Sequence, residues 1–361
     1  MILAIIVLFS YILWRLLLRR REILLEQSRS TSHLENFTPA TTQVSISSMN
    51  VNALTATNGI TDPLTAKQLK QFVIKASYHT AYNGTDLSSE MVPYALKRGY
   101  RWLDFCTDNG RDLRYTTDDT LTGIQTTSTS VSFGEIATKI AMHGFISPDS
   151  PNSTDPLFIQ IRPLYSNTDK TTNSTTMQTL KGMIEQLSAQ YNIPVFTGPI
   201  TKTTTIDQLM KKVIIVMDKN NNTTNDIDNK TNSRQLNELV NLNSNDNAFM
   251  TSLPISQASS LKAKLPLILS DNFTTTPPDK LYQFFSTGST ANSDVYSTIQ
   301  VIGSQITPMC IWSNDSHLAN YENIFNSSNA GIVPLSTVLK FTKTNNPSVT
   351  QSSYPGAFSG K

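Results

Sequence analysis

The sequence Val-Ile-Ile-Val-Met at residues 213–217 limits the possible folds of this 361-residue chain more than any other feature. Every residue in the run is apolar. In a β-strand, successive side chains point to opposite faces of the sheet, so both faces of this strand need a covering layer. That is the situation of a parallel strand with helices packed on its sheet. The run therefore predicts an α/β fold.

Strand-like and helix-like segments alternate on both sides of this run. Further strands are expected at 72–74, 101–105, 157–161, 265–269 and 306–311, and helices at 89–99, 133–145 and 177–191. Such alternation predicts a parallel sheet with covering helices. The pattern alone does not separate a closed barrel from an open sheet.

The first residues of the chain predict a membrane anchor. Residues 2–18 are apolar except for Ser10 and Arg15, and three arginines follow at 19–21. As a helix, this run spans about 25 Å, slightly less than a hydrocarbon core of about 30 Å. A cleaved signal peptide would carry its positive charge before the apolar run, whereas here the charge follows it. We therefore expect one retained transmembrane helix at 1–21.

The same arginines predict the orientation and the domain order. Basic residues beside a first helix stay on the cytoplasmic side, so we expect a single-pass protein whose C-terminal domain faces the cytosol. Residues 22–58 are expected to end the helix and form a Ser/Thr/Asn-rich spacer. A folded domain should occupy 59–345, and a tail 346–361. The net charge of +2, with no basic run beyond the anchor, argues against a nucleic-acid partner.

Four segments in one order resemble the phosphatidylinositol-specific phospholipase C family. They are Phe-Val-Ile-Lys-Ala-Ser-Tyr-His-Thr (72–80), Ala-Leu-Lys-Arg-Gly-Tyr-Arg-Trp-Leu-Asp-Phe (95–105), Lys-Val-Ile-Ile-Val (212–216) and Gly-Ser-Gln-Ile-Thr-Pro-Met (303–309). Residues 80–83 and 101–105 are most similar to the divergent phospholipase C-like proteins of large DNA viruses. The resemblance implies a distorted (β/α)8 TIM barrel of the phospholipase C-like phosphodiesterase type. Its site would lie at the C-terminal ends of the strands.

The resemblance also implies which residues stand at the catalytic positions. The family uses two histidines, together with either bound calcium or an arginine. His79 occupies the first histidine position and Asp104 the first acidic position of the next strand. The second histidine position holds Thr117, and no histidine lies near it. These remnants predict a degenerate active site.

The positions of the family's metal ligands differ as well. Thr80 replaces an Asn or Asp, Cys106 replaces an Asp or Arg, and Arg162 replaces a Glu. A hydroxyl and a thiol are poor ligands for calcium, which prefers carboxylate and amide oxygens. We therefore expect that the calcium site is lost and that the protein holds no metal or cofactor. Arg162 could bind a phosphate, or it could form a salt bridge with Asp104, and the sequence leaves both open.

These residues favour a membrane-anchored barrel that acts as a structural or binding pseudoenzyme, within the particle of a large DNA virus. Its expected partners are the lipid bilayer and either a phosphoinositide headgroup or other virion proteins. The alternative is an active phosphoric diester hydrolase acting on membrane lipid. In that case His79 would be the base, Arg162 would replace the metal, and Asp118 or Asp119 would be the acid.

Overall fold

The computed structural model describes residues 64–117, 122–146, 149–164, 170–217, 236–244, 249–257, 280–285 and 292–345. The predicted anchor, the spacer, the tail and the predicted strand at 265–269 lie outside this part of the chain. Among the described residues, none of the helices has the length and apolar character that crossing a membrane requires.

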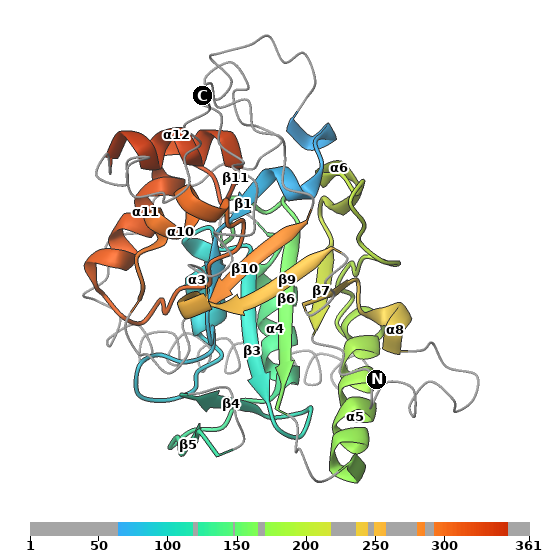
Figure 1. Ribbon diagram of the computed structural model, residues 1–361. Coiled ribbons are helices and arrows are strands. Elements are labelled where there is room, and N and C mark those ends of the chain that lie inside the picture. Colours follow the sequence, from blue (N-terminus) through green and yellow to red (C-terminus); the bar gives the residue numbers. More distant parts are fainter. Residues whose placement is uncertain are drawn as a thin grey trace, which may run out of the picture. The chain divides into compact units, whose positions relative to one another are not determined.

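A seven-stranded sheet forms the centre of the fold (Figure 1). Its strands are β2 (Ala76–Ser77), β3 (Trp102–Thr107), β4 (Leu113–Thr116), β5 (Ile124–Gln125), β6 (Leu157–Pro163), β7 (Val213–Met217) and β8 (Leu242–Asn243). Strands β2, β3, β6, β7 and β8 pair in parallel. Strands β4 and β5 extend from β3 as an antiparallel hairpin. The strand predicted from the apolar run at 213–217 is confirmed as β7, which is buried throughout.

Beyond β2 the chain adds one antiparallel and one parallel pair of strands. Strand β1 (Phe72–Ile74) pairs antiparallel with β11 (Ile332–Pro334), and β9 (Met250–Pro254) pairs in parallel with β10 (Leu281–Phe285). Ile306 bridges in parallel to both Ile74 and Gln283, so its segment lies between β1 and β10. The strand predicted at 306–311 is present only as such bridges, because Pro308 has no N–H to donate to a ladder.

Strands β3 and β6 face β9 and β10 through a buried polar cluster. The indole Nε1 of Trp102 donates to Gln160 Oε1 at 2.8 Å, and the Gln160 amide is hydrogen-bonded to the Gln283 amide. Ser252 Oγ donates to Gln283 Oε1 at 2.8 Å. These residues come from four strands, so the inward faces of both strand pairs contact one another. The α/β prediction is confirmed, while closure of the strands into a barrel stays a prediction.

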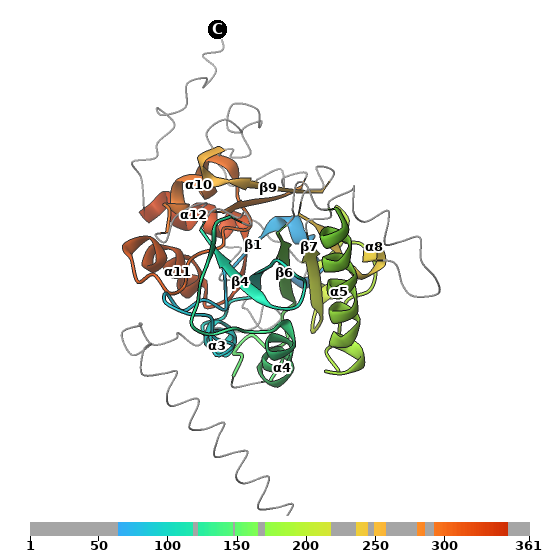
Figure 2. The ribbon, with the colours of Figure 1, turned by 90° about the horizontal axis from the view of Figure 1, so that it is seen from below.

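Helices lie outside the strands. They are α3 (Met91–Lys97), α4 (Phe133–His143), α5 (Lys170–Ala189), α6 (Ile206–Leu209), α8 (Leu236–Leu239), α10 (Val295–Ile302), α11 (Ser316–Ser328) and α12 (Leu335–Asn345), with short 3-10 turns at Leu64–Ala66, Leu69–Gln71 and Ile255–Gln257. Figure 2 shows α3, α4 and α5 in succession around the strands, and α10, α11 and α12 gathered together. The helices predicted at 89–99, 133–145 and 177–191 correspond to α3, α4 and α5. Helix α5 begins at Lys170, earlier than the predicted start at 177. The prediction started late because the first turns of the helix are polar and give no apolar signal.

A buried ion cluster joins α11 to the first strands. The Glu322 carboxylate accepts from the Arg98 guanidinium and, at 2.9 Å, from the Tyr100 hydroxyl. Lys75 Nζ lies 3.6 Å from Glu322 Oε1 and donates to the Arg98 carbonyl oxygen at 2.7 Å. Two cations thus share one carboxylate. Burial lowers the pKa of Lys75 to about 8, and the charge of Glu322 opposes this shift.

Replacing Glu322 with glutamine should destabilise the fold by about 3–5 kcal/mol, because Lys75 and Arg98 would keep buried positive charges without a counter-ion. Urea denaturation of the full chain measures this change in the free energy of unfolding. Glu238→Gln on α8 is the matched control, since Glu238 is exposed and should change little. If Glu322→Gln and Glu238→Gln were equally mild, the cluster would not be a structural element.

Candidate functional site

The candidate site lies where strands β3 and β6 end. The two strands run in parallel register, in which Asp104 pairs with Gln160 and Cys106 pairs with Arg162. Side chains alternate along a strand, so these four point to the same face of the sheet. Arg162 therefore lies on the same face as Asp104, two residues further along the neighbouring strand. At that spacing, a long arginine side chain can reach back to the carboxylate.

Arg162 and Asp104 form a two-pronged ion pair. Arg162 Nε donates to Asp104 Oδ1 at 2.7 Å, and Nη2 donates to Oδ2 at 2.7 Å. The aspartate side chain is 1% exposed and the arginine side chain 13%. The guanidinium carbon also lies 4.6 Å from the centre of the Tyr78 ring. This planar geometry, nearly free of water, is the strong form of an arginine–carboxylate contact. Of the two alternatives for Arg162, the structure contains the salt bridge.

His79 completes the cluster and is held by both partners. Its backbone N–H donates to Asp104 Oδ2 at 3.0 Å, with the residue in the left-handed region at φ 43°. Its Nε2 lies 3.2 Å from Arg162 Nη2. A guanidinium can only donate, so Nε2 accepts and the ring proton belongs on Nδ1. Burial and the charge of Arg162 hold the pKa of His79 well below its usual value, although a hydrogen bond with the Thr116 backbone acts in the opposite direction. His79 is therefore neutral at physiological pH.

Thr80 has a structural role at this site. Its hydroxyl accepts from the Asp104 backbone N–H at 2.9 Å, and its own backbone N–H donates to the Asp104 carbonyl at 2.8 Å. The hydroxyls of Thr80 and Ser77 are 2.6 Å apart, and that of Ser77 donates to the Trp102 carbonyl at 3.2 Å. The Thr80 proton therefore points to Ser77. Buried in this way, Thr80 ties the end of β2 to β3.

Thr117, at the second histidine position, contacts its own hairpin. Its backbone N–H donates to the Gly123 carbonyl at 3.2 Å, and its hydroxyl lies 3.5 Å from the same oxygen. The structure thus brings His79, Asp104 and Arg162 together, whereas Thr117 reaches the group only through its neighbour Thr116. The aspartates proposed as an acid, at 118–119, lie outside the described residues.

Aromatic side chains that no sequence pattern had pointed to lie around the cluster. The rings of Tyr82 and Tyr115 stack with their centres 3.8 Å apart, and Trp312 meets both rings edge-on at 5.0 and 6.0 Å. The Tyr115 ring also contacts the His79 ring, at 5.0 Å between centres. Trp312 comes from a distant part of the chain, so no local pattern links it to the site. His79 is only 3% exposed, and its ring also contacts the Tyr78 ring, at 4.4 Å between centres.

The residues at this site do not fit a calcium ion. Calcium takes six to eight oxygen ligands, and the carboxylate of Asp104 already binds Arg162 through both oxygens. Within the described part of the chain, no group of three or more His, Cys, Asp or Glu side chains is placed to hold a metal. Burial, with smaller effects from Asp315 and Asp104, raises the pKa of the Cys310 thiol to about 12. That thiol is therefore not a thiolate ligand either.

Comparisons with known proteins support the fold. No family model and no curated protein sequence matches the chain. The crystal structure of L. pealei PLC21 matches with a TM-score of 0.50 and 15% identity over 83% of this chain and 39% of that protein. PLC21 of S. officinalis gives 0.50 and 15% over 75% and 37%. The phosphatidylinositol-specific phospholipase C of Listeria monocytogenes gives 0.41 and 10% over 72% and 94%. The chain thus spans less than two fifths of either PLC21 protein, and its described part has a phospholipase C-like fold.

Proposed function

We propose that this protein is a phospholipase C-like pseudoenzyme, a structural or binding protein that does not hydrolyse phosphodiesters. The observation that carries the proposal is the hydrogen bond between Arg162 and His79 Nε2. A general base needs a free lone pair and a pKa near the working pH. In His79 the lone pair accepts from Arg162, and the pKa is held well below its usual value.

The second catalytic group supports the same proposal. A phosphodiesterase of this type needs an acid to protonate the leaving oxygen, and Thr117 at that position carries only a hydroxyl, which is far too weak an acid. Acid–base groups contribute about 10²–10⁴-fold each to a rate. A site in which the base is occupied and the acid is replaced would lose both contributions.

The rest of the proposal concerns the setting of this domain. The apolar run at 2–18 and its arginine flank support a single transmembrane anchor with the domain on the cytosolic side. The succession of parallel strands from β8 to β9 supports a distorted (β/α)8 barrel. From the resemblance of residues 80–83 and 101–105 to the viral proteins, we further propose that this protein lies in the membrane of a large DNA virus particle. Its partners there are the bilayer and either a phosphoinositide headgroup or other virion proteins.

The proposal predicts that the full-length chain, reconstituted in vesicles containing phosphatidylinositol, releases no inositol phosphate above the level of protein-free vesicles. The physical reason is that neither an available base nor an acid is present. His79→Ala, prepared in parallel, separates the activity of this site from a contaminant. Release that disappears in His79→Ala would overturn the proposal and establish the protein as an enzyme.

One observation favours the active alternative, namely that His79, Asp104 and Arg162 do converge. In an active phosphoric diester hydrolase, Arg162 would leave Asp104 to bind the phosphate, and His79 would then regain its lone pair. This motion would break two hydrogen bonds of 2.7 Å and leave Asp104 buried with its charge. Such an uncompensated buried charge costs several kcal/mol, which argues for the closed arrangement.

The closed arrangement predicts strong coupling between Arg162 and Asp104. Arg162→Met and Asp104→Asn should each destabilise the fold by about 3–5 kcal/mol, because each leaves a buried charge unpaired. The double variant should be clearly more stable than the sum of the two losses predicts, since it removes both charges. Chemical denaturation of the four chains measures the coupling. Small, additive losses would mean that Arg162 is available for a ligand.

A further inference from the structure

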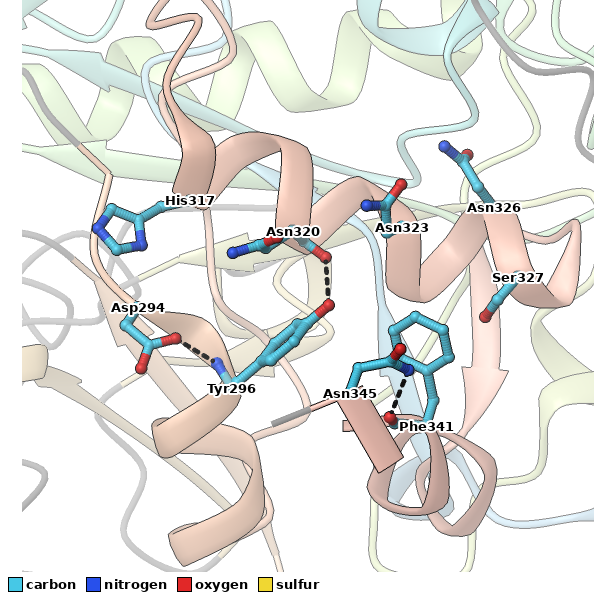
Figure 3. A pocket seen from close by; sticks show the side chains of 9 residues that line it. All are labelled: Asp294, Tyr296, His317, Asn320, Asn323, Asn326, Ser327, Phe341 and Asn345. Carbon is cyan, nitrogen blue, oxygen red and sulfur yellow. Dashed lines mark hydrogen bonds between the residues drawn. The ribbon is translucent and has the colours of Figure 1, made fainter. Parts of the chain in front are cut away.

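A second site, independent of the proposed function, lies between helices α10, α11 and α12. These helices and the residue before α10 line an open cavity of about 660 Å³ (Figure 3). Its volume is within the range of small-molecule sites, about 300–1,000 Å³. The lining contains four asparagines, a serine, a histidine, an aspartate and two aromatic residues, with no lysine or arginine.

One wall of this cavity is a stripe of uncharged polar side chains on α11. Asn320, Asn323 and Ser327 are spaced by three and four residues, so they lie on the same helix face, and all three are exposed. Asparagine is a weak helix former, so the stripe is not there to stabilise the helix. By contrast, α12 exposes Lys340 and Lys343 outside the cavity. The surface is therefore charged next to the cavity and amide-rich within it.

Two aromatic rings form the floor beside this wall. The rings of Tyr296 on α10 and Phe341 on α12 meet edge-on with centres 6.3 Å apart. The Tyr296 hydroxyl donates to the backbone carbonyl of Asn320 at 3.2 Å, which fixes the floor to the wall. In Figure 3 the Tyr296 and Phe341 rings lie below the polar side chains of α11, and Asn345 lies beside Phe341.

The charge of the cavity limits its ligand. Its one carboxylate, Asp294, caps α10 by accepting from the Tyr296 backbone N–H at 3.0 Å. Without a lysine or arginine, the lining offers no permanent positive charge to a phosphate, a sulfate or a carboxylate. A lipid chain would need an apolar lining, which the amides do not provide. The remaining class is a neutral, polar ligand.

We propose that this cavity binds a neutral carbohydrate chain. A primary amide presents donors and an acceptor side by side, which matches neighbouring sugar hydroxyls. A sugar ring also has an apolar C–H face, and the partly exposed ring of Phe341 gives that face a surface to pack on, while Tyr296 is largely buried. A polypeptide fits less well, because recognition of an extended chain uses a strand edge or pockets for apolar side chains, and three helices with an amide wall offer neither.

The test uses the full-length chain in a buffer free of sugars and of glycosidic detergents. Maltoheptaose, a mannose oligosaccharide and an N-acetylglucosamine tetramer serve as neutral probes, and a heparin oligosaccharide serves as the charged probe. Saturation-transfer NMR detects binding, and titration gives the affinity. At least one neutral probe should bind, and the heparin oligosaccharide should not bind in this cavity.

The double variant Asn320→Ala/Asn323→Ala removes two amides from the wall. It should weaken binding of the neutral probe by about tenfold or more. Its melting temperature should not fall, because alanine is the better helix former at exposed positions. Asn314→Ala, an exposed position just before α11 and outside the cavity, is the matched control and should bind normally.

Three results would overturn this assignment. They are failure of every neutral probe to bind the wild-type chain, unchanged binding by the double variant, and preferential binding of a Ser/Thr-rich peptide that the same two substitutions abolish. The last result would assign the cavity to a protein partner. None of these outcomes depends on whether the chain hydrolyses phosphatidylinositol, so this proposal and the proposed function can fail separately.

Discussion

The ion pair between Arg162 and Asp104 is the interaction on which the candidate site depends. The carboxylate of Asp104 binds Arg162 from β6 and the backbone N–H of His79, which follows β2. The backbone of Asp104 exchanges hydrogen bonds with Thr80. One aspartate on β3 thus fixes the ends of the strands on either side. Because the pair is almost fully buried, removing either partner would leave an unpaired charge in the interior.

The same pair sets the limit on chemistry. A phosphodiesterase needs a carboxylate, an imidazole and a cation that face the substrate, whereas here those three groups satisfy one another. The guanidinium uses both carboxylate oxygens and the imidazole lone pair, and aromatic rings close over His79. Under the proposed function, the groups that stabilise the strand ends are not available for a reaction. The atoms that a reaction would need are the same atoms that form these stabilising hydrogen bonds.

Local patterns predicted those parts of the fold that depend on local sequence. The strand predicted from the apolar run at 213–217 matches β7 at both ends, because a short, wholly apolar run is typical of a strand covered on both faces. The strand predicted at 306–311 was only partly right, because Pro308 prevents a regular ladder there and the segment forms isolated bridges. That His79, Asp104 and Arg162 stand at one site was implied by the family resemblance, not by any local pattern. Which partner Arg162 chooses, and the packing of Trp312 on the site, depend on long-range contacts that a local pattern does not contain. No sequence pattern pointed to the cavity between α10, α11 and α12, because asparagines are common throughout the chain.

The state of the His79 ring tests this account most directly. Histidine labelled with ¹⁵N in the full-length chain reports the protonation of each ring nitrogen by NMR. We expect a neutral ring with its proton on Nδ1 and Nε2 as an acceptor, with no titration near the usual histidine pKa of 6.5. Because the pKa of His79 is depressed in the folded chain, the unfolded chain takes up the proton first, so the fold loses stability as the pH falls from about 6.5 towards the lower folded pKa. A ring that titrates near 6.5, with Nε2 protonated or free, would contradict the closed ion pair and favour an active enzyme.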